Sequence, residues 1–64
     1  MLDIVEIYKD DAGEWRWRRK APNHEVISQG EGYTDRFNAL TGALRANPDV
    51  NTSDVKIIGR LHDE

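Results

Sequence analysis

Three cations at every second position are the residues of this chain with the clearest potential for chemistry. Arg16, Arg18 and Lys20 alternate with Trp15 and Trp17. Because neighbouring side chains of a β-strand point to opposite faces, the cations share one face and the tryptophans the other. A row of cations on an exposed strand suits the phosphates of a nucleic acid, whose released counterions drive binding. One hypothesis is therefore a nucleic-acid interface.

Pairing with carboxylates is the alternative for these cations. If the strand over 4–9 forms a hairpin with a second strand that ends at Ala21, Glu6 lies opposite Arg18, where an ion pair would neutralise both charges. Neutralised cations release few counterions on meeting a nucleic acid. We therefore predict a mixed-charge face that contacts a protein partner and keep nucleic-acid binding as the alternative. The candidate interaction face consists of Tyr8, Arg16, Arg18 and Lys20.

No grouping of residues predicts catalysis or a bound cofactor. The chain lacks cysteine, and neither His24 nor His62 stands beside carboxylates at metal-ligand spacing. The segment Gly30-Glu31-Gly32 lacks the third glycine of a dinucleotide fingerprint and the lysine of a phosphate-binding loop. We expect a non-catalytic protein without a metal or a cofactor.

Composition limits the partners and the compartment. The 64 residues include 12 acids and 9 bases, a net charge of -3 that gives no general attraction to polyanions. No segment approaches the ~20 apolar residues that span a bilayer, and the first residues lack the basic and apolar regions of a signal peptide. We predict a cytoplasmic protein with no membrane partner.

The first two strands are expected to form a hairpin. Segment 10–14 suits a three-residue loop whose last residue takes a positive φ, which Gly13 adopts at least cost. The tryptophans then belong to the core under a helix. Lys9 and Arg19 share that face, so their stems should cover its edge while their charged ends reach water. The expected cross-strand partners are Glu6 with Arg18, Ile7 with Trp17, and Tyr8 with Arg16.

A third strand and a helix follow. A tight turn at 22–24 should lead into strand Glu25–Gln29, with Ala21 facing Val26. Thr34 is the expected N-cap of the helix, with Asp35 in its first turn. The apolar stripe expected to lie on the sheet consists of Phe37, Leu40 and Leu44, with Ala43 beside them.

The helix should stop by Ala46 or Asn47, because Pro48 biases the residue before it away from helical geometry. After a polar connection, alternation predicts a last strand in which Val55, Ile57 and Leu61 share one face and Lys56, Ile58 and Arg60 the other. The expected fold is one α+β domain over residues 1–64, with the order β-β-β-α-β.

Several sequence blocks together resemble the YegP-like family of small bacterial and archaeal proteins. They are Glu6-Ile7-Tyr8-Lys9-Asp10, Gly13-Glu14-Trp15-Arg16-Trp17-Arg18, Lys20-Ala21-Pro22-Asn23, Gly30-Glu31-Gly32-Tyr33 and Asn38-Ala39-Leu40. The resemblance implies a β-β-β-α-β unit that occurs as a tandem repeat or as a homodimer. In both forms, two units share one continuous sheet and exchange their final strands. The resemblance carries no established activity.

Size makes self-association plausible on independent grounds. Chains of this length bury only ~60% of the surface that they expose when unfolded, so the apolar side chains of the last strand need shelter. We predict a homodimer with an antiparallel sheet, one helix packed on one face of each unit, and exchanged last strands. Sequence alone leaves open whether that strand packs on its own chain or on the partner. The residues expected at the strand exchange are Val55, Ile57, Ile58 and Leu61.

Overall fold

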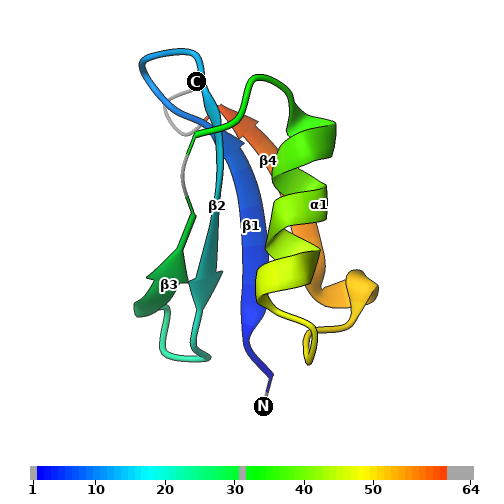
Figure 1. Cartoon of the computed structure of the whole chain (residues 1–64). Helices are drawn as coiled ribbons and strands as arrows, with labels where there is room; N and C mark the ends of the chain where they lie inside the picture. The colour runs from blue at the N-terminus through cyan, green and yellow to red at the C-terminus, as the bar shows by residue number, and fades with distance from the viewer. Residues whose placement is uncertain (1, 31, 61–64) are drawn as a thin grey trace.

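The predicted order β-β-β-α-β is confirmed by the computed structural model, which describes residues 2–30 and 32–60. The helix lies across one face of the sheet, and the other face has no layer of secondary structure on it (Figure 1). The elements are β1 (Ile4–Lys9), β2 (Trp15–Lys20), β3 (Val26–Gln29), α1 (Arg36–Ala46), the short 3-10 helix η1 (Thr52–Asp54) and β4 (Val55–Arg60).

The sheet is mixed, so the prediction of an antiparallel sheet was wrong for one of its pairs. The strand order is β3-β2-β1-β4; β1, β2 and β3 pair antiparallel, whereas β4 pairs parallel with β1. The cause is the direction of the chain. After the three antiparallel strands, the chain is at the top of the sheet in Figure 1. α1 brings it back to the bottom, so β4 must run upward beside β1 and in the same direction.

The predicted hairpin register is confirmed at every position. Ile7 pairs with Trp17, Glu6 with Arg18, and Tyr8 with Arg16. Gly13 closes the loop with a φ of 84°, a conformation that glycine adopts without steric cost.

The third strand begins one residue later than predicted, and its expected pairing was wrong. Val26 lies opposite Lys20 rather than Ala21, because the register shifts by a bulge between Arg19 and Lys20. Ala21 instead donates its N–H to the carbonyl of Glu25. The tight turn itself is confirmed, since His24 takes a φ of 71°, the left-handed geometry that histidine tolerates better than most side chains.

The ends of α1 differ from the prediction at one residue. Asp35, and not Thr34, is the N-cap, because its carboxylate accepts the N–H of Asn38 at 2.8 Å. A carboxylate there also suits the positive end of the helix dipole. The predicted end is confirmed: the helix stops at Ala46, and Asn47 caps it by donating its backbone N–H to the carbonyl of Ala43.

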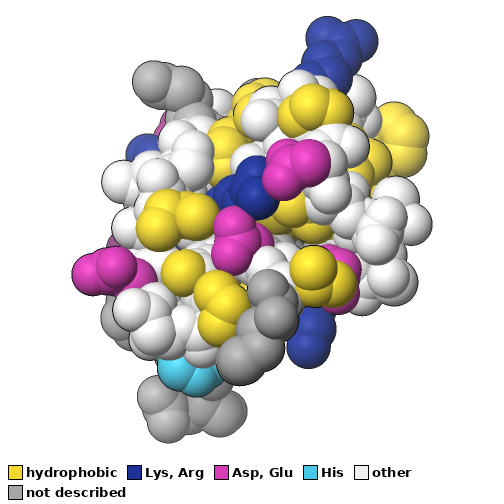
Figure 2. All heavy atoms as spheres, turned by 90° about the horizontal axis from the view of Figure 1, so that it is seen from below, with side chains coloured by type: hydrophobic (Ala, Val, Ile, Leu, Met, Phe, Trp, Pro, Cys, Tyr) yellow, Lys and Arg dark blue, Asp and Glu magenta, His cyan; other side chains and the backbone are white. Residues whose placement is uncertain are grey.

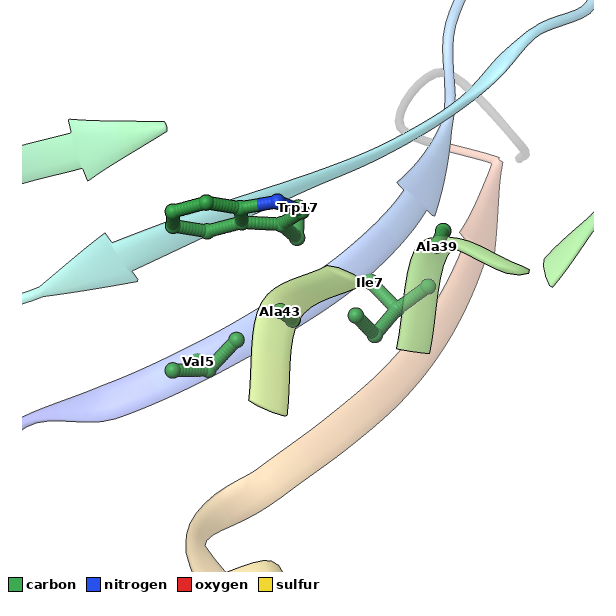
Figure 3. Close-up of a cluster of buried hydrophobic side chains, with 5 residues drawn as sticks. All are labelled: Val5, Ile7, Trp17, Ala39 and Ala43. Atoms are coloured by element: carbon green, nitrogen blue, oxygen red, sulfur yellow. The ribbon is translucent and has the colours of Figure 1, made fainter. Parts of the chain in front are cut away.

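The core lies between α1 and the two central strands, and it is built from one aromatic ring, two aliphatic side chains and two alanines (Figure 3). Trp17 is buried, as predicted. The predicted helix stripe is confirmed at Ala43, which is buried, and Leu40 and Leu44 are half-buried. It was wrong at Phe37, which is 71% exposed, and Ala39 is the other buried residue of α1. Small side chains let the helix approach the sheet closely while the indole fills the space beside them. The buried cluster is Val5, Ile7, Trp17, Ala39 and Ala43.

Two glycines admit aromatic rings at the flank of this core. A Cβ at Gly30 would overlap the indole of Trp17, and a Cβ at Gly42 would overlap the phenol of Tyr33. Tyr33 is further tied to β2 by a two-way backbone bridge with Trp15, at 2.9 and 2.7 Å. The backbone bridge therefore holds the loop before α1 to β2, and the two glycines leave the space that the rings of Trp17 and Tyr33 occupy.

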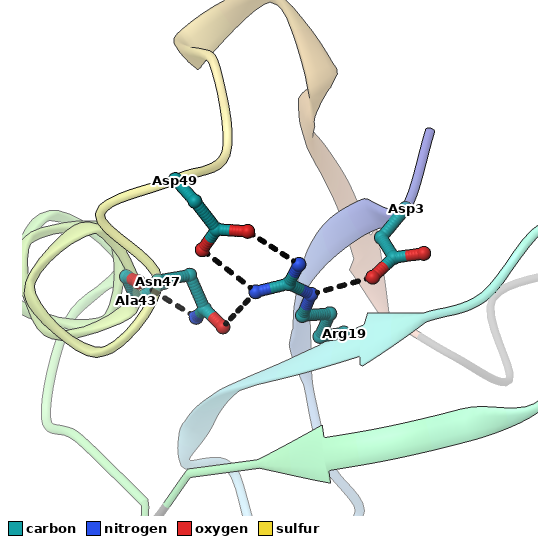
Figure 4. A network of polar contacts seen from close by, with 5 residues as sticks. All are labelled: Asp3, Arg19, Ala43, Asn47 and Asp49. Carbon is teal, nitrogen blue, oxygen red and sulfur yellow. Dashed lines mark hydrogen bonds and ion pairs between the residues drawn. The ribbon is translucent and has the colours of Figure 1, made fainter. Parts of the chain in front are cut away.

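One arginine joins the N-terminal segment and the connection after α1 to the sheet (Figure 4). The Nε of Arg19 donates to Asp3 at 2.9 Å, and its terminal nitrogens reach both oxygens of Asp49, at 3.0 and 2.7 Å, and the amide oxygen of Asn47 at 3.2 Å. The prediction that this charged end reaches water was wrong, because carboxylates from two other segments meet it. A bidentate pair of this kind fixes geometry as well as charge.

These hydrogen bonds shift the pKa values of the charged groups that form them. The hydrogen bonds that Arg19 donates hold the pKa of Asp49 below its usual range, and the acceptance of these bonds by Asp49 and Asp3 raises the pKa of Arg19. Asp49 belongs to the connection between α1 and η1, so the pair anchors that connection to β2.

The last strand is confirmed over Val55–Arg60 and pairs with β1 of its own chain. Its simple alternation is broken by a bulge, since Ile57 lies opposite Ile7 but Gly59 lies opposite Tyr8. Leu61, which was expected on this strand, lies outside the described residues. Within 2–30 and 32–60, no helix has the length and hydrophobicity needed to cross a membrane.

The Arg19–Asp49 pair predicts a specific pH dependence of stability. Because the native pKa of Asp49 is lowered, its contribution is complete above the unfolded-state pKa of about 3.9 and is lost as the pH falls through the lower native value. Asp49→Asn should therefore reduce the urea midpoint at pH 7, and the gap from wild type should close at acidic pH.

Urea unfolding of both proteins between pH 7 and pH 2 measures this gap. Glu25→Gln is the matched control, because it removes one carboxylate without touching Arg19. A gap that stays constant with pH, or one equal to that of the control, would show that the pair does not stabilise the fold.

Candidate functional site

The predicted interaction face lies on the side of the sheet away from α1, and its cations are paired. Arg18 donates through Nε to Glu6 at 2.7 Å, and Lys20 lies 3.5 Å from the same carboxylate oxygen. The Arg18 guanidinium also stacks over the ring of Tyr8, 4.9 Å from its centroid. The Tyr8 ring therefore meets Arg18, the diagonal neighbour, rather than Arg16, which lies directly opposite on the ladder.

The fourth member of the face is held by the hairpin loop. Arg16 donates its Nε to Asp10 and lies 3.8 Å from Glu14. The hydrogen bond from Arg16, with those from the backbone N–H groups of Glu14 and Ala12, lowers the pKa of Asp10; the same contact raises the pKa of Arg16. This loop is ordered by the same carboxylate that neutralises the cation.

The face as a whole balances charge. Each of its three cations has a carboxylate partner, and the three acids involved are Glu6, Asp10 and Glu14. Such a face has little unpaired charge to exchange with a nucleic acid. Its exposed groups are guanidinium and carboxylate groups, whereas Tyr8 was expected on the open face but is buried beneath Arg18, with an exposed fraction of 7%. Across residues 2–30 and 32–60, no cluster of three or more His, Cys, Asp or Glu side chains is placed to hold a metal ion.

The residues expected at the strand exchange lie on the edge of the sheet. Val55 is half-buried, whereas Ile57 and Ile58 are 49% and 40% exposed. The main contacts of α1 are with β1 and β2, so the helix leaves the β4 edge uncovered. Phe37 on the helix is exposed as well.

Sequence reasoning missed two structural groups. One is the set of Arg19, Asp3 and Asp49, whose members are far apart in the chain, so no local pattern connects them. The other is the contact of Tyr33 with Gly42. Gly42 itself was the available signal, because a glycine inside a helical pattern can mark a close packing contact.

Comparison with known proteins agrees with this fold and these motifs. Residues 10–46, more than half of the chain, match the model of a family described as "Domain of unknown function (DUF1508)". A "UPF0339 protein" of Treponema denticola is 43% identical over 58 residues, covering 86% of this chain and the whole of that protein. No solved structure gives a significant match.

Other relatives align over a shorter part. A UPF0339 protein of Neisseria meningitidis serogroup B is 70% identical over 33 residues, which are 52% of this chain and 59% of the relative. The chain thus spans little more than half the length of that relative. A "UPF0339 protein in ptx operon 5'region" of Stutzerimonas stutzeri is 51% identical over 42 residues, covering 66% of this chain and 38% of that protein.

The matched region contains β2, β3 and α1, and these supply three of the five buried core residues: Trp17, Ala39 and Ala43. The chain therefore belongs to the DUF1508 family, the YegP-like group of small proteins whose curated members carry the name UPF0339.

Proposed function

We propose that this protein is a non-catalytic interaction module that forms a homodimer through its β4 edge and presents the mixed-charge face of its sheet to a protein partner. The observation that carries the proposal is the apolar surface left beside β4. Ile57 and Ile58 of β4 are large apolar side chains exposed on a chain whose buried core is small. Apolar groups gathered beside an open sheet edge are typical of an association surface.

The open edge of the sheet at β4 is a second argument for association with another copy of the chain. β4 is the outer strand of the order β3-β2-β1-β4, so one row of its backbone groups has no neighbouring strand among residues 2–30 and 32–60. Unpaired strand edges readily pair with another strand. A two-fold dimer formed there would continue the sheet and cover the exposed isoleucines from both copies at once.

Exchange of β4 between the two copies is the form that we favour. Within one chain, β4 is held chiefly by its ladder to β1, because α1 packs on β1 and β2. Asp49 anchors the preceding connection to Arg19, and only five residues separate it from Val55. A short connection of this kind can act as a hinge for strand exchange. The family resemblance implies the same arrangement.

The mixed-charge face is the proposed contact for another protein. A dimer would carry two copies of it, related by the two-fold axis. Arg16 is the most accessible of its cations, with a side chain 39% exposed. Arginine and tyrosine are enriched in protein interfaces because they combine apolar area with directed hydrogen bonds.

Ile57→Lys should weaken self-association by roughly tenfold or more, since it buries a charge at the centre of the proposed contact. Ile27→Lys is the matched control, because Ile27 is equally exposed but lies on the opposite edge strand. Sedimentation equilibrium at micromolar concentration should find a dimer for the wild type and the control and a monomer for Ile57→Lys. A wild-type chain that remains a monomer would refute the proposed dimer.

Strand exchange can be tested with a disulfide, because the chain has no cysteine of its own. Val5 and Val55 are register partners on β1 and β4. The double variant Val5→Cys, Val55→Cys should, after oxidation, run as a covalent dimer on a non-reducing denaturing gel if β4 is exchanged. A crosslink within one chain would contradict exchange, and the two single variants control for random crosslinking.

The partner class can be tested by crosslinking in cells followed by purification. Arg16→Glu should lower the recovery of specific proteins, and nuclease treatment should leave the recovery of wild-type partners unchanged. Arg36→Glu makes the same charge change on α1, across the sheet from the face, and should behave as wild type. Loss of the recovered material on nuclease treatment would assign the face to nucleic acid instead.

A further inference from the structure

The lower end of the molecule holds two hollows that share a wall (Figure 2). The larger, of about 410 Å³, is mainly apolar and lies between the start of β1 and the turn from β2 to β3. The smaller, of about 190 Å³, lies beside Arg19. Leu2 and Asp54 line both of them. The remaining residues of the larger hollow are Ile4, Ala21, Pro22 and His24.

The two hollows differ in chemistry. Leu2, 68% exposed, is the apolar side chain common to both. The smaller hollow is acidic: Asp3, Asp49 and Asp54 line it with Arg19 as its one cation, so its charges sum to a net negative value. Figure 2 shows this end of the molecule, where a basic side chain lies between acidic ones and hydrophobic side chains surround them.

Among the three aspartates that line the smaller hollow, Asp54 is the one whose carboxylate does not bind Arg19. Its side chain is half-buried, yet within the described part of the chain it makes no hydrogen bond or ion pair. Asp3 and Asp49, by contrast, are both engaged by Arg19. A carboxylate that is partly withdrawn from water gains most from a cation that approaches it.

We propose that this end of the molecule binds a peptide segment of a partner protein in which an apolar residue stands next to an arginine or lysine. The apolar side chain fits the larger hollow, against Leu2, Ile4 and Ala21. The neighbouring cation reaches Asp54 at the boundary and meets the negative potential of the smaller hollow. The volume of the larger hollow falls within the roughly 300–1,000 Å³ typical of ligand sites.

This proposal does not depend on the dimer or on the mixed-charge face. The hollows lie at the end of the sheet opposite the hairpin loop. None of the four residues Tyr8, Arg16, Arg18 and Lys20 lines them, although Ile4, the register partner of Lys20, lines the larger one. Titrations of the Ile57→Lys variant alongside the wild type keep the two questions separate.

The test is a titration followed by amide chemical shifts in NMR, with the capped dipeptide acetyl-Leu-Arg-amide as the probe. Acetyl-Leu-Gln-amide and acetyl-Leu-Glu-amide keep the apolar residue and change the charge, whereas acetyl-Gly-Arg-amide keeps the charge and removes the apolar side chain. We expect the largest shifts at Leu2, Ala21, His24 and Asp54, and roughly three- to tenfold tighter binding of the probe than of each comparison peptide.

Variants of the protein test whether the carboxylate of Asp54 recognises the cation of the peptide. Asp54→Asn should remove the preference for arginine over glutamine while leaving the fold unchanged, since the side chain has no structural partner. Leu2→Ala should weaken binding of the probe and of the glutamine peptide alike. Asp11→Asn, which makes the same charge change in the hairpin loop at the other end of the sheet, should bind as wild type.

Several results would overturn the proposal. They are equal binding of the arginine, glutamine and glutamate peptides, an unchanged preference in Asp54→Asn, shifts that map elsewhere on the molecule, and no shift at all. Shifts of the same resonances that depend on protein concentration rather than on peptide would assign the hollows to a second copy of the chain and would likewise reject the peptide.

Discussion

The close contact of one helix with two of the four strands is the constraint on which this structure depends. Ala39 and Ala43 bring α1 down onto β1 and β2, where Trp17 fills the space beside them. Because an α-helix is only about 10 Å wide, it cannot also cover β4 in that position. The same contact that builds the core therefore leaves the β4 edge open, and the exposed side chains of Ile57 and Phe37 follow from it.

Ion pairs hold in place the segments that so small a core does not fix. On the helix side, Arg19 ties the N-terminal segment and the connection after α1 to β2. On the open side, Glu6 and Asp10 neutralise the cations of β2 and order the hairpin loop. The basic run that dominates the sequence thus acts first as a structural element. Any recognition by this face depends on the geometry of paired groups more than on net charge.

Local patterns predicted the strands, the hairpin register and the extent of the helix, because alternation, the glycine turn and Pro48 each act within a few residues. They placed Ala43 on the side of α1 that faces the sheet but did not predict that Ala39 is buried and Phe37 exposed, since that choice depends on the volume of Trp17, a residue distant in sequence. The partners of Arg19 were not predicted either, because they too are distant from it in sequence. The parallel pairing of β4 could have been predicted from the direction of the chain, whereas the bulge in β3 had no signal in the pattern.

The central claim is that β4 is incompletely sheltered within one chain and gains its shelter from a second copy. Hydrogen exchange of backbone amides, measured over a range of protein concentrations, tests this most directly, because association protects only the amides that it covers. The account predicts that protection of Lys56 to Gly59 rises with concentration while protection of the central strands β1 and β2 changes much less. Equal protection of β4 at every concentration, in a chain that sediments as a monomer, would contradict it.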